Sequence, residues 1–67
     1  MNNEIKEWFK VPGRHVSCIE YCDEYWYVTL DSGNLDDLHT VDGSAETLEE
    51  ALVTAVLAFY RTKCGGI

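Results

Sequence analysis

The segment TLEEALVTAVLAFYRTK, residues 47–63, constrains the fold most strongly, because its apolar residues recur with the spacing of an α-helix. Thr47 and Glu50 have the spacing of a capping box, in which the hydroxyl accepts from the Glu50 amide and the carboxylate reaches the Thr47 amide. Gly65 and Gly66 follow, and glycine ends helices readily because it adopts the left-handed backbone conformation. We therefore expect one long C-terminal helix.

Two apolar stripes run along this expected helix. The first stripe should pack on a sheet and consists of Leu48, Ala51, Leu52, Ala55, Val56 and Phe59. The second stripe lies on a different side of the helix and consists of Val53, Leu57 and Tyr60. Because a helix on a sheet needs one apolar face, the second stripe requires another cover: an N-terminal helix, a second copy of the chain or a foreign partner.

The rest of the chain predicts one short helix and three strands. Ile5, Trp8 and Phe9 share one face of a helix expected over residues 4–10, and the Val11-Pro12-Gly13 turn ends it. Strands are expected at residues 14–22, 25–30 and 35–41, with turns at residues 23–24, 31–34 and 42–44. The predicted fold is α+β: a short N-terminal helix, a three-stranded antiparallel sheet and the long helix packed on one face.

Alternation predicts which strand residues face the helix. In the second strand, the set expected to face the helix consists of Trp26, Val28 and Leu30. The opposite set consists of Tyr25, Tyr27 and Thr29. In the first strand the alternation is imperfect, with one face carrying Val16, Cys18 and Cys22 and the other carrying Ile19 and Tyr21. We therefore expect both faces of the first strand to be partly covered.

The size of the chain leaves little material for a catalytic cleft. Its 67 residues make one domain, residues 1–67, with a marginal core. On an extended strand Cys18 and Cys22 lie about 13 Å apart, which is too far for a disulfide. Cys64 is the third cysteine, and an odd number of cysteines cannot all pair within one chain. These cysteines and the two histidines, His15 and His39, form no close pair of the kind that zinc sites use. We expect no metal, no cofactor, no catalytic residue and no enzymatic activity.

The first ten residues lack the basic start and apolar core of a signal peptide. No apolar run approaches the roughly 20 residues that span a bilayer. We therefore expect a cytoplasmic protein without a membrane partner.

The charges are distributed unevenly along the chain. Ten of the twelve carboxylates lie between Glu20 and Glu50, and this acidic sector contains no Lys or Arg. The net charge of −7 and the absence of a basic patch argue against direct nucleic-acid binding and favour a cationic partner. The alternative interpretation is a solvated face that keeps a small protein soluble.

Two resemblances involve YWYVTL, residues 25–30, and AETLEEAL, residues 45–52. This layout resembles the strand-to-helix segment of small phage-encoded inhibitors of bacterial RNA polymerase. It is also similar to the partial ribonuclease-H-like domain of HicB-type antitoxins, in which strands lead into a TLEEAL-like helix. The Pro-Asp-Leu-Pro-Gly-like turn of those antitoxins is replaced here by residues 31–37, and no DNA-binding module follows Lys63. The resemblances therefore imply a layout and no functional residue.

These observations predict a small acidic, non-enzymatic interaction protein, a phage or mobile-element inhibitor of the anti-CRISPR or host-polymerase type. Acting as a nucleic-acid mimic, it would cover the basic nucleic-acid-binding surface of a host protein or ribonucleoprotein. The expected partner contacts are Asp31, Asp36, Asp37, Asp42, Glu46 and Glu49, flanked by Tyr25 and Tyr27. The alternative is an antitoxin-like regulatory module that neutralises a partner protein and forms a homodimer through Val53, Leu57 and Tyr60.

Overall fold

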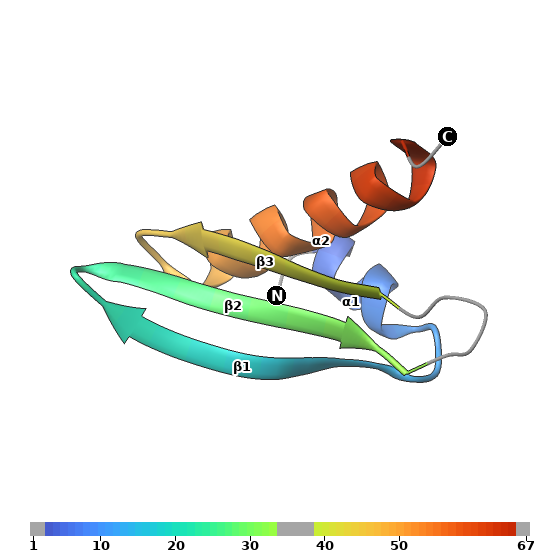
Figure 1. The fold of residues 1–67 in the computed structure, drawn as a ribbon, viewed down its shortest axis with the longest axis horizontal. Coiled ribbons are helices and arrows are strands. Elements are labelled where there is room, and N and C mark those ends of the chain that lie inside the picture. The colour runs from blue at the N-terminus through green and yellow to red at the C-terminus, as the bar shows by residue number, and fades with distance from the viewer. Residues whose placement is uncertain (1–2, 34–38, 66–67) are drawn as a thin grey trace.

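The computed structural model describes residues 3–33 and 39–65, including their side chains except those of His39 and residues 62–65. Helix α1 (Asn3–Phe9) is followed by strands β1 (Arg14–Cys22), β2 (Tyr25–Ser32) and β3 (His39–Ala45) and by helix α2 (Leu48–Gly65). The strands form one antiparallel sheet in the order β1-β2-β3. Both helices lie on the same side of this sheet (Figure 1). The predicted α+β fold is confirmed.

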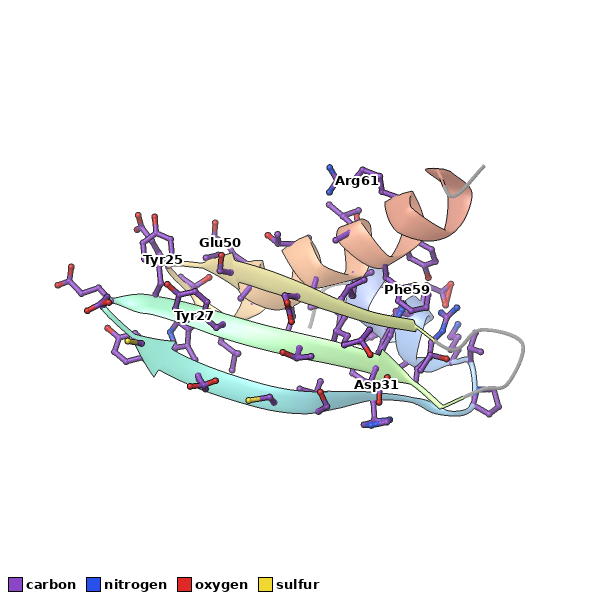
Figure 2. The ribbon with its side chains drawn as sticks, in the orientation of Figure 1. Tyr25, Tyr27, Asp31, Glu50, Phe59 and Arg61 are labelled. Atoms are coloured by element: carbon purple, nitrogen blue, oxygen red, sulfur yellow. The ribbon has the colours of Figure 1, made fainter. Side chains whose placement is uncertain are left out.

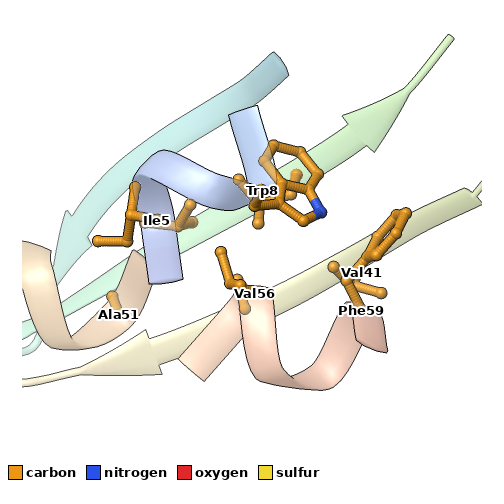
Figure 3. Close-up of a cluster of buried hydrophobic side chains, with 9 residues drawn as sticks. Ile5, Trp8, Val41, Ala51, Val56 and Phe59 are labelled. Carbon is orange, nitrogen blue, oxygen red and sulfur yellow. The ribbon is translucent and has the colours of Figure 1, made fainter. Parts of the chain in front are cut away.

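The two helices and the sheet enclose one apolar core (Figure 3). The sheet contributes Val28 and Leu30 of β2 and Val41 of β3. The helices contribute Ile5 and Trp8 of α1 and Ala51, Ala55, Val56 and Phe59 of α2. We call the sheet surface that carries Val28 and Leu30 the inner face, and the opposite surface the outer face. The first stripe of α2 thus packs on the sheet as predicted, with its other members, Leu48 and Leu52, half-buried.

Helix α1 closes the core at the end where β1 begins. Trp8 packs edge-on against Phe59, with ring centroids 5.4 Å apart. Arg14 places its guanidinium 4.7 Å from the Phe59 centroid and 5.3 Å from the Trp8 centroid. Its Nη1 also donates a hydrogen bond to the Trp8 carbonyl oxygen at 3.1 Å. Of the predicted aromatic pair, Trp8 is therefore a core residue, whereas Phe9 is exposed.

Strand β3 differs from the prediction. The sequence predicts a strand at residues 35–41 and a turn at residues 42–44, whereas β3 extends from His39 to Ala45. Residues 35–38 lie outside the described part of the chain. The misplaced turn has a simple cause, because an Asp-Gly-Ser tripeptide is typical of turns.

Gly43 occupies a strand position because α2 crosses β3 there. It lies opposite Val28 on the inner face. A Cβ atom at Gly43 would be 2.4 Å from the Ala55 amide nitrogen and 2.5 Å from the Ala51 carbonyl oxygen. Glycine in a strand commonly marks such a close backbone approach. The prediction that Gly43 is a turn glycine is wrong.

A β-bulge at Ser17 changes the faces of β1. The register with β2 shifts between Val16 and Cys18. Val16 consequently lies on the inner face with Ile19 and Tyr21, and the outer face receives Cys18, Glu20 and Cys22. The prediction that Val16 shares a face with both cysteines is wrong, because strict alternation does not anticipate an extra residue.

Local hydrogen bonds and a tight turn define the start of α2 and the β1–β2 connection. The Glu50 amide donates to Thr47 Oγ1 (3.2 Å), as the capping box predicts. The Glu50 carboxylate accepts a hydrogen bond from the same hydroxyl (2.9 Å) and not from the Thr47 amide that the capping box predicts. In the β1–β2 connection, Asp23 and Glu24 have φ values of 52° and 67°. Two positive φ values define a type I′ turn, whose twist matches that of the strands.

Candidate functional site

The outer face of the sheet carries four of the predicted contact residues. Its side chains come from all three strands and are His15, Cys18, Glu20, Cys22, Tyr25, Tyr27, Thr29, Asp31, Thr40, Asp42 and Ser44. In the described part of the chain, neither helix covers this face (Figure 1). Tyr25 and Tyr27 are 42% and 44% exposed. Figure 2 shows both tyrosines and Asp31 along β2.

Each strand contributes one carboxylate to the outer face: Glu20, Asp31 and Asp42. Threonines on neighbouring strands orient two of them. Thr29 Oγ1 donates to Asp42 Oδ1 at 2.9 Å, and Thr40 Oγ1 donates to Asp31 Oδ1 at 3.0 Å. A carboxylate has about four lone-pair sites, so each keeps acceptor capacity for a partner after its threonine bond.

Negative charge dominates this face. None of its described side chains belongs to Lys or Arg. His15 Nε2 lies 3.6 Å from Asp31 Oδ2, and this imidazole carries positive charge when it is protonated. Because strands hold the three carboxylates on one surface, their fields add and attract a cationic partner.

An open hollow of about 520 Å³ lies on the outer face. Its lining consists of Glu20, Cys22, Tyr27, Thr29, Asp42 and Ser44 of this face, together with Val28, Gly43 and, from α2, Thr54. Carboxylates form strong charge-assisted hydrogen bonds with guanidinium and ammonium groups, and a tyrosine ring attracts the same cations through its π-face. The hollow is therefore chemically suited to basic side chains of a partner protein.

The Cys18 thiol lies beside this negative charge. Its Sγ donates a hydrogen bond to Glu20 Oε1 at 3.6 Å. Desolvation raises the pKa of the Cys18 thiol, and the hydrogen bond and charge of Glu20 and the charge of Asp42 raise it further. A raised pKa lowers the thiolate fraction at neutral pH, so Cys18 is not activated as a nucleophile.

The remaining predicted contact residues lie elsewhere. Glu46 is exposed in the connection between β3 and α2, and Glu49 is exposed in the first turn of α2. Asp36 and Asp37 lie outside the described residues. The described carboxylates of the acidic sector are thus divided among the outer face, the hairpin turn at Asp23 and Glu24, and the start of α2.

Glu20 is an outer-face carboxylate that the sequence prediction omits. A signal for it exists in the sequence, because the apolar residues Val16, Ile19 and Tyr21 break strict alternation next to Ser17. Such a break is what a β-bulge produces. Placing the bulge there assigns Glu20 to the outer face.

The second stripe of α2 is partly uncovered. Val53 is half-buried against the core, whereas Leu57 and Tyr60 are 47% and 38% exposed. Helix α1 packs into the core through Ile5 and Trp8. The N-terminal helix, one of the three predicted covers, therefore leaves Leu57 and Tyr60 accessible.

Within residues 3–33 and 39–65, no three His, Cys, Asp or Glu side chains are grouped so that they could hold a metal ion. Cys18 and Cys22 are free thiols. Neither helix, as far as its residues are described, has the combination of length and apolar character needed to cross a membrane.

Comparison of the chain with family models, with curated proteins and with solved structures finds no match. The geometry of the outer face is therefore the basis for a functional proposal.

Proposed function

We propose that this chain is a small acidic, non-enzymatic interaction protein that covers a basic nucleic-acid-binding surface of a host protein or ribonucleoprotein. The observation that carries the proposal is the placement of Glu20, Asp31 and Asp42 on one uncovered sheet face, beside the exposed rings of Tyr25 and Tyr27. We infer a phage or mobile-element inhibitor, of the anti-CRISPR or host-polymerase type, that acts in the cytoplasm of the host cell.

The proposed mechanism is electrostatic and steric exclusion. Lys and Arg side chains that would otherwise contact phosphates meet carboxylates that the strands hold in place. Thr29 and Thr40 already orient Asp42 and Asp31, so less side-chain freedom is lost on binding. The tyrosine rings add apolar contact area, as aromatic residues commonly do at protein interfaces. Nucleic acid is then excluded because its binding surface is occupied.

The test uses a target that the wild-type chain captures from a host lysate and that mass spectrometry identifies. Affinity for that purified target is measured for the wild type and for the double variant Asp31→Asn/Asp42→Asn at several salt concentrations. We expect the double variant to bind at least about tenfold more weakly, because two charge-assisted contacts are lost. Wild-type affinity should fall steeply with salt, because exposed charge pairs are screened over about 8–10 Å.

A matched control is the double variant Glu4→Gln/Glu7→Gln, which removes the same number of charges from α1. It should bind nearly as tightly as the wild type, because the effect depends on the outer face and not on net charge. An affinity that does not change with salt concentration, or an equal loss of affinity in the two double variants, would reject the outer face as the binding site.

A second candidate function is an antitoxin-like module that dimerises and neutralises a partner protein. The exposure of Leu57 and Tyr60 favours this candidate, because it leaves an apolar strip of α2 available for a second copy. It requires self-association through α2, which the outer-face proposal does not.

A further inference from the structure

Part of the inner face carries apolar side chains that neither described helix covers. Ile19 is 47% exposed and Tyr21 is 59% exposed, although both lie on the face that forms the core. The Tyr21 ring packs on the half-buried Trp26, with ring centroids 5.0 Å apart. Helix α2 packs over β2 and β3, and α1 packs at the beginning of β1. The end of β1 next to the hairpin turn is therefore left open.

The start of α2 forms one wall beside this open surface. Trp26 lies opposite Tyr21 on one side and opposite Ala45 on the other, and α2 begins three residues after Ala45. Leu48 and Leu52 on this part of α2 are half-buried and line a hollow of about 340 Å³ with Ile5 and Glu49. We call the surface formed by the exposed or half-buried side chains of Ile19, Tyr21, Trp26, Leu48 and Leu52 the inner groove.

The rim of the inner groove is negatively charged. Asp23 and Glu24 form the hairpin turn at its open end, and Glu46 and Glu49 lie where α2 begins. The described Lys and Arg side chains are on or just after α1, at the start of β1 and near the end of α2, namely Lys6, Lys10, Arg14 and Arg61. A binding segment that has apolar residues on one side and Lys or Arg at its flanks complements this arrangement.

We propose that the inner groove binds a basic amphipathic helix of a partner protein. A helix satisfies its own backbone hydrogen bonds, as a segment lying on apolar side chains must. The open length of β1, from Cys18 to Cys22, is about 13 Å at 3.3 Å per residue, enough for two to three helical turns. Two copies of this chain are poorly suited to one another here, because each brings a net charge of −7 and the same acidic rim.

This interaction is distinct from the proposed function, because the inner groove and the outer face lie on opposite sides of the sheet.

The probe for the inner groove is a synthetic helical peptide of about fourteen residues, roughly four turns, with a leucine stripe and lysine elsewhere. Binding is followed through the indole N–H signals in NMR spectra. Trp26 in the groove should shift, whereas Trp8, which is fully buried, should not.

Matched variants locate the binding site. Ile19→Thr and Tyr21→Thr both place threonine, which favours strands, in β1 and should each weaken peptide binding by about fivefold or more, since they remove exposed apolar contacts. Tyr27→Thr removes a similarly exposed tyrosine from the outer face and should leave the affinity measured from the Trp26 shift unchanged. A peptide with glutamate in place of lysine should bind at least about tenfold more weakly, because the rim repels it.

Three outcomes would overturn the proposal. One is absence of a Trp26 shift with the lysine peptide, and another is an equal effect of Tyr27→Thr and Tyr21→Thr. The third is a dimer of the chain alone that Ile19→Thr or Tyr21→Thr dissociates, since the groove would then hold a second copy. In the Asp31→Asn/Asp42→Asn variant the Trp26 shift should saturate as in the wild type, because this signal reports binding in the inner groove and not lysine contacts with the outer face. Failure of the outer-face proposal therefore leaves this test intact.

Discussion

The backbone of Gly43 in β3 lies against Ala55 in α2, so closely that a Cβ atom on the glycine would be 2.4 Å from the Ala55 amide nitrogen. The obstacle is helix backbone, which cannot rotate away as a side chain can. The contact fixes the distance between the sheet and its main helix, and it therefore fixes how deeply Ala51 and Ala55 are buried.

Gly43→Ala should strongly destabilise the domain. Overpacking in a closed core costs about 1–3 kcal/mol, and this change lies at the upper end because the obstructing atoms are all backbone atoms of α2. For a domain of this size we expect thermal unfolding about 10 °C lower or more. Gly33→Ala is the control, because its Cβ would lie at an ordinary 3.5 Å from the Gly13 carbonyl oxygen. Equal melting temperatures for the two variants would contradict the close approach at Gly43.

Arg14→Lys should destabilise the domain by about 1 kcal/mol, because a compact and more strongly hydrated ammonium group does not replace the contacts of the guanidinium with the Trp8 and Phe59 rings. Urea unfolding measures the loss. Lys10→Ala is a suitable comparison: Lys10 Nζ lies 2.6 Å from Glu7 Oε2, but both side chains are largely exposed. Exposed pairs of this kind contribute about 0–1 kcal/mol. An Arg14→Lys variant as stable as the wild type would show that charge, not stacking, holds this position.

Glu20→Gln should make Cys18 more reactive. Glu20 helps to raise the pKa of the Cys18 thiol, so its neutralisation lowers that pKa and increases the thiolate fraction at a given pH. The measurement is the rate of alkylation by iodoacetamide against pH, in a Cys22→Ser/Cys64→Ser background. The midpoint should move to lower pH with Glu20→Gln and stay in place with Glu24→Gln in the hairpin turn. An unmoved midpoint in the Glu20 variant would place that carboxylate away from the thiol.

Leu57→Asp distinguishes the two candidate functions. Leu57 is 47% exposed, so a charge there should lower the free energy of unfolding by less than about 1 kcal/mol. Val53→Asp should cost more, because Val53 packs against the core. The antitoxin-like candidate expects a wild-type dimer in light scattering and a monomer for Leu57→Asp. A wild-type chain that is already monomeric leaves the outer-face proposal as the better explanation.

The helical parts of this fold could be predicted because their signals are local. The spacing of Leu48, Ala51, Val56 and Phe59 identifies the packed face of α2, and Thr47 with Glu50 identifies its start. The faces of β2 were equally predictable over the predicted strand, residues 25–30, which alternates without interruption. The predicted turn at residues 31–34 is wrong at its start, because Asp31 and Ser32 continue the strand. Short-range periodicity carries all the information that these elements need.

The errors arose where long-range packing decides the structure. Nothing next to Gly43 in the sequence indicates that a helix backbone will lie on it, and Asp42 and Ser44 are typical turn neighbours. The bulge at Ser17 inverts the faces of the residues after it, so a single extra residue moved Glu20 to the candidate site. The sequence predicted an acidic sector, but the placement of Asp42 on the outer face depends on the register between β2 and β3.

The bulge at Ser17 has a consequence for the behaviour of the protein at high concentration. Strand β1 is an edge strand, and a flat edge is a template on which further chains can add as a growing fibril. The extra residue bends the row of free amides and carbonyls, so incoming strands cannot pair along its full length. The bulge thus opposes strand addition at the edge beside which Ile19 and Tyr21 are exposed.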